Sequence, residues 1–276
     1  RFINDMNLDI WVKETGNPEA CTMFPAMFAR WFLKNNTKFQ QQGVKFMHNA
    51  PYILSHLAGL KGKDAFIDWG AMSGWGLGYN VMKKEWSKEQ LEILGINEKY
   101  MPRILKPWDI IGGLTKAMSE KTGLPEGTPI CAGAGDTMQS MIGCGNYEAG
   151  KGVDVAGTCA MFCVSTKGII PELSKKGNNL IFNSGSLPDT YFYWGTIRTG
   201  GLALRWFKDN VCHKANAAVS YNDLNDRAAQ VPVGSNGVLF LPSLTGGQDI
   251  NNKQCGCFLG LKLNSDQSVT WRSVLD

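Results

Sequence analysis

The sequence lacks both a long apolar run and a concentration of charge of one sign. Its apolar stretches, such as GVLFLPSL at 237–244, are far shorter than the about 20 residues that a membrane-spanning helix needs. The 28 basic residues are interspersed with 24 acidic ones, which leaves a formal net charge of only +4. Nucleic-acid and membrane-surface proteins normally carry a basic stripe or a basic amphipathic helix. We therefore expect neither a nucleic-acid partner nor a membrane partner.

Metal-binding and secretion signals are also scarce. The eight cysteines form no CxxC pair, although zinc-binding sequences usually contain such pairs. No basic segment followed by an apolar one opens the chain, as it would in a secretory signal peptide. The sequence thus predicts no metal-ligating residues and a reducing, cytoplasmic location. The first residue, Arg1, is not methionine, so we expect a fragment or a processed product.

Three signatures of common enzyme classes are missing as well. There is no GxxxxGK[ST] loop, no GxGxxG fingerprint and no GxSxG elbow. These absences argue against P-loop NTPases, Rossmann dehydrogenases and α/β-hydrolases. Apolar residues make up 43% of the 276 residues, which is enough to build a core. We expect an ordered protein with parts of two domains.

Helix and strand signals alternate along the chain, which favours an α/β architecture. The clearest helix lies in WSKEQLEILGI at 86–96. Ser87 is the expected N-cap, Gln90 completes a capping box, and Gly95 supplies the stop. A second helix is predicted over 115–120.

The stretch GAGDTMQSMIGCG at 133–145 places one acid, Asp136, between glycines and a helix-like run. The preceding TPICAGAG predicts a short buried strand, and Met138 and Met141 follow at helical spacing. Asp136 is therefore expected at a strand-to-helix junction, where ligands collect in open α/β sheets. Because Asp is also a favoured N-cap, a helix cap and a general base both remain open. The role of Asp68, in FIDWGAMSG, is undecided in the same way: it is either a buried helix cap or a residue of the functional site.

The pattern changes to β type after Gly145. GVDVAG and AMFCVST predict two strands of a hairpin around Gly157 and Thr158, and YFYWGTI at 191–197 predicts another strand. A glycine turn exposes backbone N–H groups that can cradle anionic oxygens. An ordinary β-turn explains the same two residues, so the hairpin alone does not decide between a phosphate-binding turn and a purely structural one.

Helices are predicted again in TGGLALRWFKDNV and YNDLNDRAAQV, and the change of pattern near residue 147 is the expected domain boundary. The order of all these motifs resembles that of the FGGY carbohydrate kinases, the family of xylulokinase, gluconate kinase and glycerol kinase, along nearly the whole chain. The segments that carry the resemblance are IWVKETGNPEA at 10–20, FIDWGAMSGWG at 66–76, KKEWSKEQLEILGI at 83–96, GGLTKAMSEKTGLPEGTPICAGAGD at 112–136, AGTCAMF at 156–162, TGGLALRWFKDN at 199–210, GVLFLPSLTGG at 237–247 and GCFLGLKLNSDQSVTWRSVLD at 256–276.

The resemblance implies an α/β fold of the RNase H-like, actin-like ATPase type in a two-domain sugar kinase that is incomplete at both termini. Residues 1–147 would be the C-terminal part of the first, sugar-binding domain. Residues 148–276 would be the first part of the second, nucleotide-binding domain. The family's N-terminal phosphate loop and its glycine-rich adenine site fall outside the chain, so little or no turnover is expected from this exact chain.

The resemblance also implies roles for five residues. Asp136 occupies the place of the catalytic base and contacts the substrate, and Thr137 is a further sugar-contacting candidate. Gly157 and Thr158 match the family's phosphate-contacting turn. Gly201, in TGGLALRW, matches a glycine that packs near the nucleotide phosphates.

The implied activity is ATP-dependent phosphorylation of a hydroxyl group on a sugar or polyol, such as the ketose xylulose, with ATP and Mg²⁺. A homodimer is compatible with it. The lysine of the family's first signature is missing from PAMFARWFLKNN, so no single sugar is named. A non-catalytic sugar-binding or regulatory relative is the alternative. Retention of Asp136 and Thr158 favours the kinase, because a binding module needs no base beside a phosphate turn.

Overall fold

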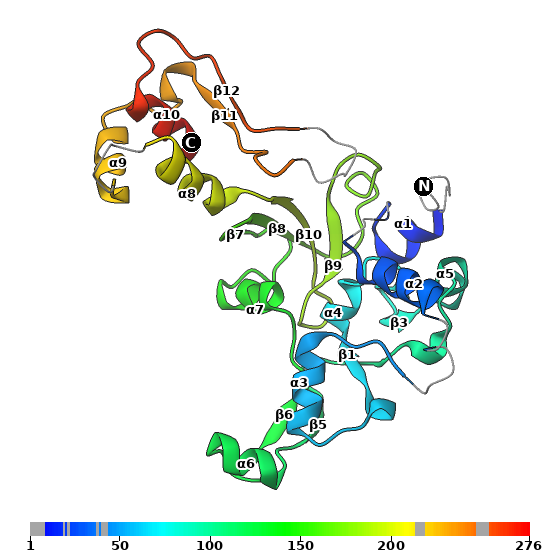
Figure 1. Ribbon diagram of the computed structural model, residues 1–276. Helices are drawn as coiled ribbons and strands as arrows, with labels where there is room; N and C mark the ends of the chain where they lie inside the picture. The colour runs from blue at the N-terminus through cyan, green and yellow to red at the C-terminus, as the bar shows by residue number, and fades with distance from the viewer. Residues whose placement is uncertain are drawn as a thin grey trace. The chain divides into compact units, whose positions relative to one another are not determined.

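The computed structural model describes residues 9–18, 20, 23–36, 39, 44–212, 219–246 and 254–276. The chain divides into two units, of which the first holds Arg1–Val153 and Cys163–Trp194 and the second holds Asp154–Phe162 and Gly195–Asp276. Both units mix helices and strands (Figure 1). The predicted boundary near residue 147, between a sugar-binding and a nucleotide-binding domain, stays a prediction.

Seven short α-helices lie among the described residues of the first unit. They are α1 (Asp9–Thr15), α2 (Pro25–Asn35), α3 (Asn49–Leu57), α4 (Trp69–Ser73), α5 (Lys88–Leu94), α6 (Lys116–Thr122) and α7 (Asp136–Gly143). The longest of them, α2, has 11 residues. In the part of the chain that the structure describes, no helix combines the length and the apolar character that crossing a membrane requires.

The strands pair locally into small sheets. The strands are β1 (Phe66–Asp68), β2 (Tyr79–Asn80), β3 (Glu85–Trp86), β4 (Arg103–Leu105), β5 (Ile110–Gly113), β6 (Pro129–Cys131), β7 (Gly152–Ala156), β8 (Ala160–Thr166), β9 (Ile181–Ser184) and β10 (Tyr191–Ile197). β1 pairs in parallel with β4, whereas β2 with β3 and β5 with β6 are antiparallel. The order β7-β8-β10-β9 forms a four-stranded sheet. The predicted strands AMFCVST and YFYWGTI coincide with β8 and β10.

The caps of α5 explain why this helix starts and stops where the sequence predicts. The Ser87 hydroxyl accepts a hydrogen bond from the Gln90 backbone N–H, and Gly95 ends the helix at a φ of 67°. A left-handed residue of this kind favours glycine. The second half of the predicted capping box is wrong, because the Gln90 side chain accepts from the Gly78 N–H and donates to Glu14 instead.

Unit one has a large aromatic core that joins distant parts of the sequence. Trp11, Trp75 and Phe182 are fully or almost fully buried in it. Asn17, at the end of α1, accepts a 2.8 Å hydrogen bond from the Phe182 backbone N–H, 165 residues away. A buried amide with satisfied donors and acceptors fixes the strand β9 against α1. A second, smaller cluster around Phe66 lies under α3.

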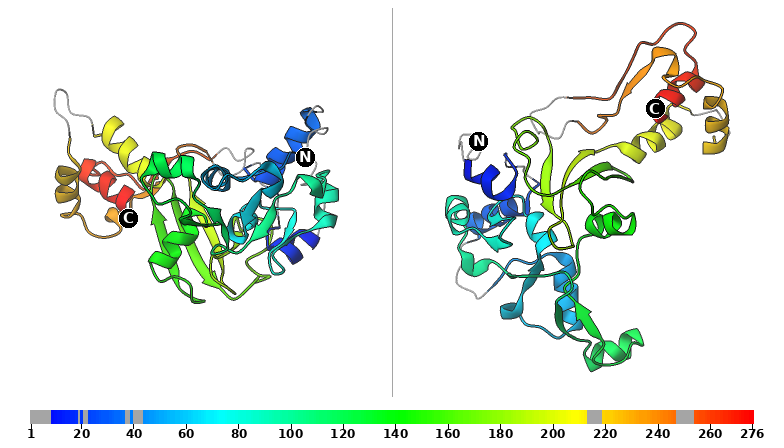
Figure 2. Two further views of the ribbon diagram at one scale, coloured as in Figure 1. Left: turned by 90° about the horizontal axis from the view of Figure 1, so that it is seen from below. Right: turned by 180° about the vertical axis from the view of Figure 1, so that it is seen from behind.

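After Ile197, the described residues of unit two contain three α-helices and one antiparallel pair of strands. They are α8 (Gly200–Asn210), α9 (Tyr221–Ala228), α10 (Gln267–Leu275), β11 (Leu239–Leu241) and β12 (Cys257–Leu259). The three helices gather together, as Figure 2 shows from behind. Phe207 of α8, Leu224 of α9 and Trp271 of α10 form their shared buried core. The helices predicted in TGGLALRWFKDNV and YNDLNDRAAQV are thus confirmed as α8 and α9.

Candidate active site

Asp136 lies where the sequence predicts it, between a strand and a helix. β6 ends at Cys131, the chain turns through Gly133 with a φ of 78°, and α7 starts at Asp136 itself. The N-cap of α7 is Gly135, and no side chain caps it. Asp136 is therefore the first residue of α7 and not its N-cap, although its carboxylate accepts a hydrogen bond from one backbone N–H of the first turn, that of Thr137.

The Asp136 side chain is exposed, and within the described part of the chain the hydrogen bonds of its carboxylate involve Oδ1 alone. Oδ1 accepts from the Thr137 backbone N–H at 2.7 Å and from the Thr137 hydroxyl at 3.5 Å. Burial along α7 explains the exposure, since Met138 and Met141 face the interior whereas Asp136 and Gln139 face solvent. One carboxylate oxygen is thus oriented by the helix, and the other is open.

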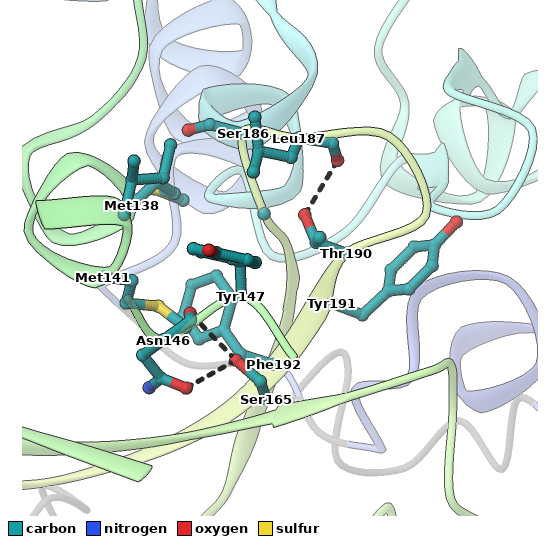
Figure 3. Close-up of a pocket in the computed structure, with 12 residues that line it drawn as sticks. Met138, Met141, Asn146, Tyr147, Ser165, Ser186, Leu187, Thr190, Tyr191 and Phe192 are labelled. Atoms are coloured by element: carbon teal, nitrogen blue, oxygen red, sulfur yellow. Dashed lines mark hydrogen bonds between the residues drawn. The ribbon is translucent and has the colours of Figure 1, made fainter. Parts of the chain in front are cut away.

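A small cavity of about 10 Å³, room for about one water molecule, lies on the buried side of α7 (Figure 3). Met138 and Met141 project into it from the helix, and Tyr147 and Ser186 border it. The Ser186 hydroxyl is buried and has no hydrogen-bond partner within the described part of the chain. This cavity is not the site of Asp136, which is on the opposite face of the helix.

The three nucleotide-binding candidates come together in the second unit. The Gly201 backbone N–H donates to the Gly157 carbonyl oxygen at 2.8 Å, and the Leu202 N–H donates to the Thr158 carbonyl oxygen at 3.2 Å. A Cβ at position 201 would lie 2.5 Å from the Gly157 oxygen. Glycine is therefore required at 201 by the backbone of the hairpin turn itself, which the sequence did not reveal.

Sequence patterns did not point to the residues around this contact. A Cβ at Gly200 would lie 2.8 Å from the Ala160 backbone nitrogen. Thr199 is buried and donates its hydroxyl to the Pro242 carbonyl oxygen. The close approach at Gly200 seats the first turn of α8 on the turn between β7 and β8, and the Thr199 bond ties it to the segment after β11. Because the carbonyl groups of the turn face α8, the exposed Thr158 hydroxyl remains accessible to a ligand.

Asp68 turns out to be a buried helix cap. Its Oδ1 accepts from the backbone N–H groups of Gly70 at 2.8 Å and of Ala71 at 3.0 Å, at the start of α4. Burial raises the pKa of the carboxyl group to about 6, and the two backbone hydrogen bonds oppose that rise. The cap explanation of Asp68 is thus supported by its contacts.

A partly buried amine lies near this cap. Lys84 Nζ is 2.6 Å from Ser184 Oγ, 4.3 Å from the ring centre of Tyr191 and 5.5 Å from that of Trp69. Burial lowers the pKa of Lys84 to about 8, while the charge of Asp189 acts in the opposite direction. The aromatic faces offset part of the cost of holding an ammonium group away from water.

Comparison with known proteins gives a family for this chain. The profile described as the FGGY family of carbohydrate kinases, N-terminal domain, matches residues 1–143. The xylulose kinase of Bacillus subtilis (strain 168) is 29% identical over 173 residues, which are 60% of this chain and 32% of that protein. The gluconokinase of the same organism is 24% identical over 273 residues, 96% of this chain and 51% of that protein.

Solved structures agree on the fold. The crystal structure of xylulose kinase from Rhodospirillum rubrum superposes with a TM-score of 0.80 at 22% identity, covering 99% of this chain and 53% of that one. The chain thus spans about half the length of that structure and of the gluconokinase, and about a third of the length of the xylulose kinase of Bacillus subtilis. The predicted actin-like sugar-kinase fold is confirmed. The chain belongs to the FGGY family of carbohydrate kinases.

Proposed function

We propose that the protein that contains this chain phosphorylates a hydroxyl group of a sugar or polyol with ATP, and that Asp136 is the general base. A ketose such as xylulose is the acceptor we favour, because a xylulose kinase is among the relatives. The observation that carries the proposal is the Asp136 carboxylate. It is exposed directly after a glycine turn, and its hydrogen bonds leave one oxygen open.

The proposed reaction moves one proton and one phosphoryl group. The acceptor oxygen forms a bond to the γ-phosphorus of ATP, and the bond from that phosphorus to the bridging oxygen breaks. ADP leaves with the electron pair, and the hydroxyl proton passes to Asp136. A sugar hydroxyl is a weak nucleophile, so a carboxylate within hydrogen-bond reach lowers the barrier. The Thr137 N–H, 2.7 Å from Oδ1, keeps the carboxylate oriented for this transfer.

The nucleotide side of the reaction is assigned to the hairpin turn. Thr158 offers an exposed hydroxyl group to a phosphate oxygen, and Gly157 is held in place by its contact with Gly201. Phosphoryl transfer depends mainly on alignment and on neutralising charge. A turn that is anchored on a helix therefore suits the phosphate tail of ATP. Thr137 remains a candidate for sugar contact.

Mg²⁺ is expected to enter with the nucleotide. Proteins usually hold this ion through one or two carboxylates together with the phosphates themselves. No group of three potential metal ligands lies among the described residues. The ion would supply charge neutralisation on the phosphates.

The base assignment predicts the effect of Asp136→Asn. In the complete natural protein that contains this sequence, we expect ADP release with xylulose to fall at least about 100-fold, because general bases contribute about 10²–10⁴-fold. The matched control is Asp223→Asn, which alters another exposed aspartate in the first turn of a helix and should leave the rate unchanged.

Three outcomes separate the assignments. If the wild-type protein phosphorylates xylulose, gluconate or glycerol and Asp136→Asn is equally active, the base assignment is wrong and the kinase proposal stands. If the wild-type protein releases no ADP with any of these acceptors but binds one of them in calorimetry, the non-catalytic sugar-binding alternative holds. If it neither binds nor reacts with them, the proposed substrate class is wrong.

A further inference from the structure

Trp108 stands at the tip of a tight turn. The Asp109 backbone N–H donates to the Lys106 carbonyl oxygen at 3.0 Å, which closes a four-residue turn. The Asp109 carboxylate also accepts from the Lys106 N–H at 2.9 Å. Pro107, the second residue of the turn, favours this geometry because its ring fixes φ. The backbone that presents Trp108 is therefore rigid.

This turn is attached to the segment that leads into Asp136. The Gly133 N–H donates to the Pro107 carbonyl oxygen at 2.8 Å, and the Ala132 N–H donates to the Asp109 carbonyl oxygen at 2.9 Å. The two residues that flank Trp108 are thus hydrogen-bonded to residues three and four positions before Asp136. Trp108 is close in space to the proposed base, although it is distant from it in the sequence.

The ring of Trp108 packs against a neighbouring ring and is partly open to solvent. Its indole packs edge-to-face on Trp69, with ring centres 5.1 Å apart and planes at 87°. Trp69 is 8% exposed, whereas Trp108 is 44% exposed. A single exposed aromatic residue is ordinary on a protein surface. It is less ordinary for an indole to be held both by a closed turn and by a second, buried indole. These two contacts pre-organise the remaining surface of the Trp108 ring for a ligand.

An unpaired donor lies behind this ring. The indole N–H of Trp69 is buried and has no hydrogen-bond partner within the described ranges. Buried polar groups without partners are uncommon and call for an explanation. A hydroxyl group of a ligand or an ordered water held with it would satisfy this N–H group.

We propose that Trp108 is a sugar-contacting residue, against whose exposed ring the carbon-bound hydrogens of the acceptor sugar or polyol pack. The proposal rests on the proposed kinase function and adds to it a residue that selects the acceptor. The negative face of an aromatic ring attracts the partly positive hydrogens of a sugar's C–H groups, and a large ring buries apolar area with few rotamers to restrict. Trp69 supports the platform through its edge-to-face contact, and its buried N–H group is the unpaired donor beside it in the described part of the chain.

The test compares Trp108→Ala with Trp108→Phe in the complete natural protein. With xylulose as the variable substrate, we expect Trp108→Ala to raise KM about tenfold, with a smaller change in kcat and an unchanged KM for ATP. Trp108→Phe should restore most of the affinity, because the aromatic face is retained. The matched control is Ile110→Ala, which removes another exposed apolar side chain, 58% exposed, two residues further along.

A second readout does not depend on turnover. Xylulose titrated into the protein without nucleotide should change the tryptophan fluorescence of the wild type, and Trp108→Phe should reduce that change. Binding that is equal in wild type and Trp108→Ala would overturn the proposal, as would KM values for xylulose and ATP that rise together. Failure of the kinase proposal is distinguishable from failure of the Trp108 proposal. In the first case even the wild type, with Trp108 intact, releases no ADP.

Discussion

Asp68 illustrates how a single residue acquires its role from burial. The carboxyl group is only 3% exposed, and it accepts two backbone N–H groups at the start of α4. Burial disfavours the charged form, which raises the pKa to about 6 from an ordinary value of 3.8. Folding therefore becomes less favourable as the pH rises from about 4 to about 6, because the unfolded chain releases this proton first. The local sequence FIDWGAMSG contains none of this information.

The pH dependence of stability tests this effect. One unit of pKa is worth about 1.36 kcal/mol, so ionising Asp68 costs the folded state roughly 3 kcal/mol. Asp68→Asn keeps an acceptor oxygen for α4 but does not ionise. We expect the stability of this variant relative to wild type, measured by urea unfolding, to increase by up to that amount between pH 4 and pH 7. A difference that is the same at both pH values would show that the carboxyl group does not titrate in this range.

At the scale of elements, the contact between the hairpin turn and α8 explains a glycine that the resemblance assigned to the nucleotide. Gly201 and Gly157 are 44 positions apart, and their backbones are 2.8 Å apart from nitrogen to oxygen. Close approach of this kind needs glycine because a side chain would occupy the space of the carbonyl group. A structural role of Gly201 thus exists whether or not ATP lies near it.

Substitution of Gly201 by alanine should be destabilising. Its Cβ would lie 2.5 Å from the Gly157 oxygen, so either the turn or the helix must move. Overpacking of this kind costs about 1–3 kcal/mol. The matched control is Gly143→Ala in α7, where no atom lies within 4 Å of the added Cβ and where helix propensity favours alanine by about 0.5–1 kcal/mol. In urea unfolding, the free energy of unfolding should fall for Gly201→Ala and rise for Gly143→Ala. Equal stability of Gly201→Ala and wild type would contradict the contact.

At the scale of the whole molecule, each unit has a buried cluster of its own. Trp11, Trp75 and Phe182 belong to the first unit, and Phe207 and Trp271 to the second. Each cluster is formed by residues of one unit, so the loss of one cluster does not by itself expose the other. Proteins with separate cores commonly depart from two-state unfolding.

Calorimetry of this chain should therefore resolve two transitions. Removal of a large buried aromatic side chain costs about 3–5 kcal/mol. We expect Trp11→Ala to lower the midpoint of one transition and Phe207→Ala to lower the midpoint of the other. The two residues are 1% and 0% exposed, respectively, so the substitutions are comparable. A single transition that shifts in both variants would show that the two cores unfold together.

Much of the fold could be predicted from the sequence because its signals are local. The Ser87 cap and the Gly95 stop of α5 act within one helical turn. The strands β8 and β10 follow from runs of branched and aromatic residues. The position of Asp136 between β6 and α7 follows from a glycine turn next to a helical pattern. The order of the motifs was sufficient to predict the family, which the match over residues 1–143 shows.

The remaining features depend on contacts between residues that are distant in the sequence. The Gln90 side chain binds Glu14, 76 positions away, rather than its own helix. Trp108 gains its orientation from Trp69, and Gly201 gains its constraint from Gly157. The sequence by itself determined where α5 begins and ends and which segments form β8, β10, α8 and α9, since caps, turns and periodicity act over a few residues. Tertiary structure alone decided which carboxyl is buried, which ring is open and which glycine is indispensable, because burial and close approach arise only when separate segments pack together.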